Sequence, residues 1–146
     1  MLDITFRKYD FRFTTTEGKQ YIFDEIRKKN ILLTPEEWVR QHIIHYLVYD
    51  KNYPKAMIAV EKEFKVNHLK KRFDILVYSR DMQPFLLIEC KSPKISLNEA
   101  AISQIANYNS KFQSKYLWAS NGNQNYCFDI SKQVPVALNE IPEFGT

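Results

Sequence analysis

The sequence predicts an α/β domain in which a mixed central sheet is flanked by helices and preceded by an N-terminal β-hairpin. Segments 73–78 and 85–90 are apolar on both alternating faces, which is typical of strands buried on both sides. Helical patterns precede and follow these strands. A chain of 146 residues with 45% hydrophobic positions is long enough to bury one core. We therefore expect residues 1–146 to form a single domain, with 1–33 as the hairpin region and 34–142 as the core.

The hairpin region is expected to form short antiparallel strands. Segments 10–15 and 20–24 are the strand candidates, and Glu17-Gly18 between them is a turn signal at hairpin distance. A run of basic residues and one asparagine, 27–30, separates this hairpin from the apolar stretch 31–33.

The first helix is predicted to run from Thr34 to about Asp50. Thr34 is a favoured N-cap residue, Pro35 suits the first helical position, and Glu37 completes a capping box with Thr34. An apolar stripe then recurs at helical spacing: Trp38, Val39, Ile43, Tyr46 and Leu47.

One further helix and five strands are expected after Asn52-Tyr53-Pro54 breaks the helical pattern. The helix covers about 96–112, where apolar residues again recur at helical spacing. Asn121-Gly122 predicts a turn between the last two strands. The strands are expected at 57–66, 72–79, 84–90, 116–120 and 125–130.

Asp74 and Glu89 are predicted to face each other across neighbouring strands. If Arg80 faces Gln83 at a hairpin turn, regular antiparallel pairing places the Cβ atoms of Asp74 and Glu89 roughly 4.5–5.5 Å apart. Lys91, two residues beyond Glu89, is then expected on the same face. Two carboxylates this close repel each other, and a hard divalent cation such as Mg²⁺ removes the repulsion.

Structural alternatives stay open for these residues. Lys91 can neutralise Asp74 and Glu89 as an ion pair without a metal, and a register slip of one residue would move Asp74 to the opposite face. His42 and His45 lie three apart on a predicted helix and could bind one ion. The histidines and cysteines nevertheless lack the paired spacing of a zinc site.

Asp74, followed by Glu89-Cys90-Lys91 at the end of the next strand and then by a helix, resembles the PD-(D/E)xK nuclease superfamily. The match is more specific over roughly 20–142, where the chain resembles the N-terminal nuclease-like domain of type I restriction enzyme R subunits in a small stand-alone form. Two departures are visible: Phe73 replaces the motif's proline, and no GxxxxGK[ST] loop is present, so no ATP-driven motor is implied. The segments that carry the wider match are 34–41, 60–62, 72–77, 88–93, 104–108 and 120–122.

This resemblance implies a restriction-endonuclease-like three-layer core and hydrolysis of phosphodiester bonds, dependent on Mg²⁺ or Mn²⁺. Asp74 and Glu89 would hold the metal together with the Cys90 backbone carbonyl. Lys91 would orient or deprotonate the attacking water and stabilise charge on the phosphate. Glu37 occupies the place of a helix-borne acid found in many superfamily members, with helix capping as its alternative role.

Further candidates surround this predicted site. Gln104 and Tyr108 match a QxxxY signature of some superfamily nucleases and share one helical face, although Tyr108 also belongs to an apolar stripe. The residues expected to contact nucleic acid are Lys70, Lys71, Arg72, Lys94 and Tyr108.

The net charge of +4 permits a polyanionic partner without identifying one. DNA is the expected partner, and the resemblance adds a homodimer or other restriction-system subunits. We expect no membrane span and no signal peptide, and hence a cytoplasmic protein whose two cysteines stay reduced. The alternative to a nuclease is a non-catalytic nucleic-acid-binding or protein-interaction module on the same fold.

Overall fold

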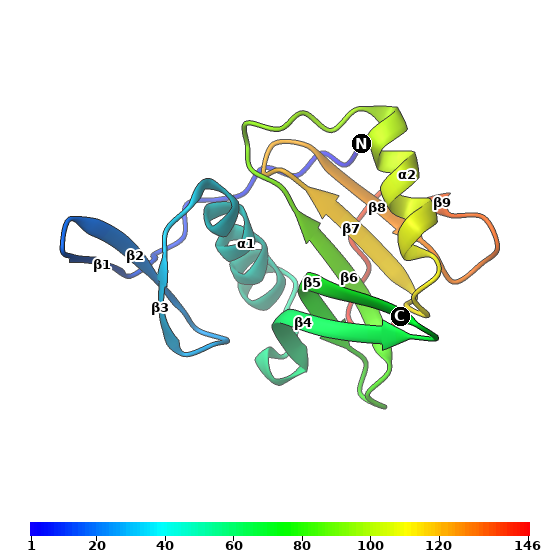
Figure 1. Cartoon of the computed structure of the whole chain (residues 1–146), viewed down its shortest axis with the longest axis horizontal. Helices are drawn as coiled ribbons and strands as arrows, with labels where there is room; N and C mark the ends of the chain where they lie inside the picture. The colour runs from blue at the N-terminus through cyan, green and yellow to red at the C-terminus, as the bar shows by residue number, and fades with distance from the viewer.

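The computed structural model describes the backbone of residues 1–146 and every side chain except those at positions 64, 66 and 69. It contains a three-stranded antiparallel sheet, a six-stranded mixed sheet and two α-helices, which confirms the α/β class (Figure 1). The elements are β1 (Phe13–Thr16), β2 (Lys19–Asp24), β3 (Lys29–Leu32), α1 (Pro35–His45), β4 (Ile58–Val66), β5 (Leu69–Tyr78), β6 (Pro84–Cys90), α2 (Glu99–Asn109), β7 (Tyr116–Ser120), β8 (Asn125–Asp129) and β9 (Val136–Ala137).

The three-stranded sheet extends the predicted hairpin. Glu17 and Gly18 join β1 to β2 with φ angles of 51° and 76°, as a two-residue hairpin turn requires. The third strand, β3, is missing from the sequence prediction because Lys29 and Asn30 are poor strand formers. Its pairing with β2 makes it a strand.

Helix α1 begins as predicted. The Thr34 hydroxyl accepts a hydrogen bond from the Glu37 amide at 3.0 Å, and Pro35 occupies the first turn. The α-helix ends at His45, and a π-helical turn (Tyr46–Asp50) completes the predicted length.

The six-stranded sheet separates two apolar clusters. Its strand order is β4-β5-β6-β7-β8-β9; β6 and β7 are parallel, and the other neighbours pair antiparallel. Helix α2 connects β6 to β7 and covers one face, while the C-terminal segment passes behind the other (Figure 1). The face toward α1 buries Val39, Ile43, Ile75, Val77, Ile88 and Trp118. The face toward α2 buries Phe73, Leu76, Leu87, Ala106 and Leu117.

The β5–β6 register agrees with the prediction at the centre of the pair. Ile75 faces Ile88, so Asp74 and Glu89 are the next residues on their strands. The assumed turn is wrong, because Tyr78 faces Pro84 after a register shift between Val77 and Tyr78. This irregularity compensates for the different turn, which is why the inner register is still correct.

Other boundaries differ from the predictions. Helix α2 starts at Glu99, because the Asn98 side chain caps it by accepting from the Ala101 amide at 2.8 Å, and it ends at Asn109. The short strand β9 and a 3₁₀ turn (Lys55–Met57) are not predicted. Within the described part of the chain, no helix has the length and apolar character needed to cross a membrane.

The cap of α1 yields a stability prediction. Thr34→Ala removes the acceptor of the Glu37 amide and should lower the free energy of unfolding by about 1 kcal/mol. Thr34→Ser keeps the hydroxyl and is the control, for which we expect a much smaller loss. Urea unfolding followed by circular dichroism measures both, and equal stability of Thr34→Ala and wild type would contradict the assigned cap.

Candidate active site

Asp74 lies where β5 and β6 stop pairing with each other. One carboxylate oxygen, Oδ1, accepts from Arg40 Nη2 at 2.9 Å. The other, Oδ2, accepts from the backbone amide of Cys90 at 2.7 Å. Asp74 is therefore fixed on one side by α1 and on the other by the last residue of β6.

Arg40 connects Asp74 to a buried cluster of charges. Its Nη1 donates to Glu37 Oε1 at 2.5 Å. The other Glu37 oxygen accepts from Arg27 at 2.8 Å and from Gln41 at 3.0 Å. Burial lowers the pKa of the Arg40 guanidinium, but the carboxylates of Glu37 and Asp74 outweigh this and raise it. Arg40 consequently carries a permanent positive charge between two carboxylates.

Asp24 ends this cluster on the side of the three-stranded sheet. Its fully buried carboxylate accepts from the backbone and side chain of Arg27 and from Gln41. Burial opposes ionisation of Asp24, but these hydrogen bonds prevail and lower its pKa. An alternating series of charges thus runs from β2 through α1 to β5.

Glu37 has a structural role that differs from the predicted one. Its amide forms one half of the capping box with Thr34, but its carboxylate binds Arg27, Arg40 and Gln41. If Glu37 has no catalytic role, its carboxylate therefore serves as a member of a buried ion-pair cluster and not only as part of a helix cap.

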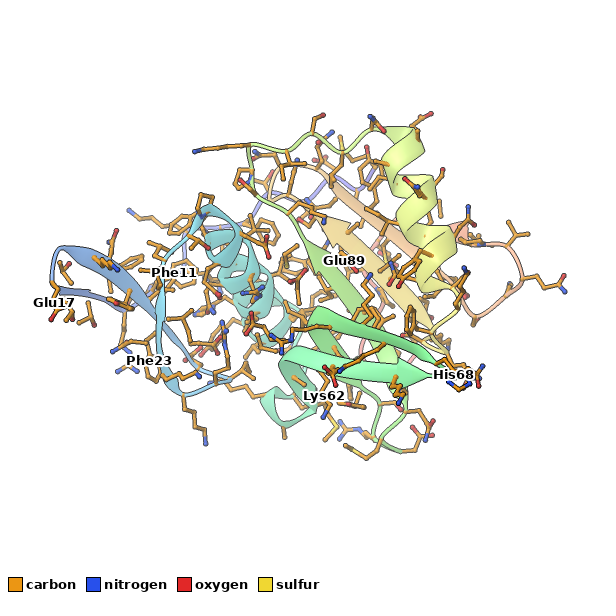
Figure 2. All side chains as sticks on the ribbon, viewed as in Figure 1. Phe11, Glu17, Phe23, Lys62, His68 and Glu89 are labelled. Carbon is orange, nitrogen blue, oxygen red and sulfur yellow. The ribbon has the colours of Figure 1, made fainter. Side chains whose placement is uncertain are left out.

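Glu89 lies near the carboxyl end of β6 (Figure 2). Its carboxylate pairs with a different cation from that of Asp74. The Lys71 ammonium forms a close ion pair with Glu89 Oε1 and donates to Asn109 Oδ1 at 3.0 Å. It also lies 4.8 Å from the centre of the Tyr108 ring. Glu89 is thereby held on the side of the sheet that α2 covers.

The two carboxylates that were predicted to share a face have different cation partners in this structure. Asp74 reaches Arg40 on α1, whereas Glu89 reaches Lys71 beside α2. The regular alternation of side chains between the two faces of β5 fails around Asp74. Phe73 and Leu76 both pack toward α2, although residues three apart on a regular strand point to opposite faces.

Lys91 follows the end of β6, and its amide donates to the Ser120 carbonyl at 2.8 Å. The alternative in which Lys91 neutralises both acids as an ion pair is wrong, since Arg40 and Lys71 fill that role. Among the described side chains, the Lys91 ammonium has no ion-pair partner. Burial and the charge of Asp74 raise the pKa of the Glu36 carboxyl, and the positive charge of Lys91 opposes this rise.

The structure separates the remaining candidates. Lys71 pairs with Glu89, and the Tyr108 ring lies beside the Lys71 ammonium, as described above. Gln104 and Lys94 are exposed, and no described side-chain contact joins them to the carboxylates. The Lys70 ammonium nitrogen lies 3.5 Å from a carboxylate oxygen of Glu63, and Arg72 faces Glu63 across the β4–β5 pair.

Sequence reasoning missed Arg40 and the pairing of Lys71 with Glu89. A signal was present for Arg40, which follows Glu37 by three positions on a helix. No such signal existed for Lys71, because strict alternation places it on the face opposite to Glu89.

Among the described residues, the histidines and cysteines do not gather in a group of three or more potential metal ligands. His42 and His45 each bond to a backbone carbonyl of α1 through Nδ1, at 2.8 and 3.0 Å. Cys90 is buried, and burial followed by the charge of Asp74 raises its thiol pKa well above the usual value, so it is a poor nucleophile. In the part of the chain that the structure describes, no three His, Cys, Asp or Glu side chains converge as metal ligands.

Comparison with known proteins gives one family. Residues 35–143, most of the chain, match the family model described as the type I restriction enzyme R protein N terminus. A search of the curated proteins finds no match.

The buried cluster around Arg40 yields a second stability prediction. Arg40→Met leaves the carboxylates of Glu37 and Asp74 without their shared cation, and should lower the free energy of unfolding by about 3–5 kcal/mol. Arg7→Met, which removes an exposed ion pair with Asp50, is the control and should change it little. Urea unfolding compares them, and equal losses in both variants would show that the cluster is not a main source of stability.

Proposed function

The chain belongs to the family of type I restriction enzyme R protein N-terminal domains, and from that premise we propose that it is a Mg²⁺-dependent nuclease domain that hydrolyses phosphodiester bonds of DNA. One observation carries the proposal: the register of β5 and β6 brings Asp74 and Glu89 to adjacent positions at a strand end, with Lys91 just beyond. This arrangement suits the PD-(D/E)xK superfamily.

The donor atoms at this strand end fit a hard cation. Asp74, Glu89 and the Cys90 carbonyl offer oxygen atoms alone, which is the ligand type that Mg²⁺ prefers, and Mg²⁺ commonly keeps several waters beside one or two carboxylates. The absence of a third acidic ligand in the described residues is compatible with such a site. When bound there, the cation would lower the pKa of a water and polarise the phosphate.

The chain's own cations have separate tasks in this proposal. Lys91 has no ion-pair partner among the described side chains, so its ammonium is available to orient the attacking water and to stabilise charge on the phosphate oxygens. Arg40 keeps Asp74 in position. Lys71 occupies Glu89, and coordination of a metal by Glu89 requires this ion pair to loosen.

Basic side chains on the β4–β5 hairpin supply contacts to the DNA backbone. Lys70 and Arg72 are exposed on β5, one on either side of Lys71. Phosphate contacts of this kind position nucleic acid without reading its sequence. Other subunits of a restriction system are the second class of partner that the family supports.

The second candidate function is a non-catalytic nucleic-acid-binding or protein-interaction module. Its supporting observation is that each carboxylate already has a protein cation, Arg40 for Asp74 and Lys71 for Glu89. In that case both acids serve the fold alone.

Cleavage assays test the nuclease directly. Asp74→Asn keeps the size of the side chain but removes its charge and replaces one of its two acceptor oxygens by an NH₂ donor. Lys91→Ala removes the ammonium. Each should slow Mg²⁺-dependent DNA cleavage by at least about a hundredfold. The controls Asp81→Asn and Lys132→Ala change exposed residues elsewhere and should cleave normally. Unimpaired cleavage by both Asp74→Asn and Lys91→Ala would refute the assignment.

Metal binding separates the two candidate functions without relying on cleavage. Mn²⁺ at about a hundred times its Kd should raise the free energy of unfolding of the wild type by about 2.7 kcal/mol. Glu89→Gln should lose most of this gain, whereas Glu99→Gln, an exposed change on α2, should keep it. If Mn²⁺ leaves the wild type's stability unchanged, the non-catalytic module is the better description.

A further inference from the structure

A cavity of about 410 Å³ is lined by α1 and by the loop that follows the predicted catalytic Lys91. Its walls come from the N-terminal segment, the first turns of α1 and the loops that follow β6 and β7. Its volume falls within the range of small-molecule sites, about 300–1,000 Å³. Pro93, which lines it, follows the proposed catalytic Lys91 by two residues in the sequence.

The loops that form this cavity are fastened to each other. The Asn121 side chain donates to the Ile95 carbonyl at 2.7 Å, which ties the loop after β7 to the loop after β6. Gly122 approaches α1 closely, since a Cβ at this position would lie 3.4 Å from Val39 Cγ2. Its φ of +92° also favours glycine. The cavity is thus built on anchored backbone.

Aromatic rings form much of the wall. Trp38, Phe6 and His42 all line the cavity, and the Trp38 and His42 ring centres lie 4.4 Å apart. Trp38 is 40% exposed although it belongs to the apolar stripe of α1. Phe11, between α1 and the three-stranded sheet, packs against the Trp38 ring at a centroid distance of 5.7 Å (Figure 2). The Trp38 ring is therefore packed against other aromatic rings over part of its surface and exposed over another part.

Polar atoms complete the cavity. Burial lowers the pKa of His42, so its imidazole is neutral at pH 7. Its Nδ1 donates to the Trp38 carbonyl at 2.8 Å, which leaves Nε2 as a hydrogen-bond acceptor. Thr5 and Asn123 add a hydroxyl and an amide to the lining.

We propose that this cavity binds one unstacked base of a DNA strand whose phosphate lies at Lys91. A planar heterocycle needs a ring face for stacking and hydrogen-bonding groups at its edge, and the cavity supplies both. This inference rests on the proposed function for the identity of the ligand. It assigns to the site a substrate class, namely single-stranded or locally opened DNA.

The two tryptophans make the proposal measurable. Trp118 is fully buried, whereas Trp38 is exposed, so a bound base should quench the emission of Trp38 alone. Titration with a single-stranded oligonucleotide in EDTA, where no metal-dependent cleavage occurs, should give saturable quenching in the wild type and none in Trp38→Phe. Trp38→Ala should bind the same oligonucleotide on the order of tenfold to a hundredfold more weakly by fluorescence anisotropy, the size of one lost base–aromatic stack. Tyr49→Ala removes another exposed aromatic ring and should bind as the wild type does.

Each outcome decides between the cavity and the nuclease proposals. Wild-type affinity of Trp38→Ala, or quenching that persists in Trp38→Phe, overturns the cavity proposal. Mg²⁺-dependent cleavage by the wild type together with an unquenched Trp38 overturns the cavity proposal and keeps the nuclease. Failure of the wild type to bind the oligonucleotide also overturns the cavity proposal, while the Mn²⁺ titration judges the metal site by itself. If Trp38→Ala does not fold, Asn123→Ala takes its place in the affinity measurement.

Discussion

The fold depends on the guanidinium of Arg40, which lies between the carboxylates of Glu37 and Asp74. This single cation joins α1 to β5, and Arg27 repeats the arrangement between Glu37 and Asp24 on the side of β2. Because these groups are largely buried, removing one of them leaves its partners without compensation in a poorly solvated place. The same contacts determine where the Asp74 carboxylate sits, so the stability of the domain and the geometry of its candidate active site share one set of interactions.

The two acidic residues of the candidate site differ in how firmly they are held. Asp74 is fixed by a guanidinium and a backbone amide, both of which belong to rigid elements. Glu89 is held by the flexible side chain of Lys71, whose ammonium it shares with Asn109. A lysine is a mobile point charge on a long stem, whereas arginine makes directional contacts. In the proposed nuclease, Asp74 would therefore be the preorganised ligand and Glu89 the one that adjusts.

Much of the fold follows from local sequence patterns. The N-cap at Thr34 and the strands with two apolar faces were predicted correctly, because capping and burial act through neighbouring residues. Strand β3 and the irregular register at Tyr78 depend on pairing partners distant in sequence, and no local pattern specifies them. The positions of Asp74 and Glu89 on adjacent strands were predictable, but the directions of their side chains were not, since alternation breaks at Asp74 and distant cations attract each carboxylate.

The three-stranded sheet lies outside the segment that matches the family model, which begins at residue 35. It nevertheless supplies Asp24 to the charge cluster, and the strand-free chain before it supplies Phe6 to the cavity wall. A fragment cut at the family boundary would lose these groups and the Thr34 cap as well. The folded unit that makes these contacts is therefore larger than the region that sequence similarity delimits, and a fragment that begins at the family boundary would lack part of the charge cluster and of the cavity wall.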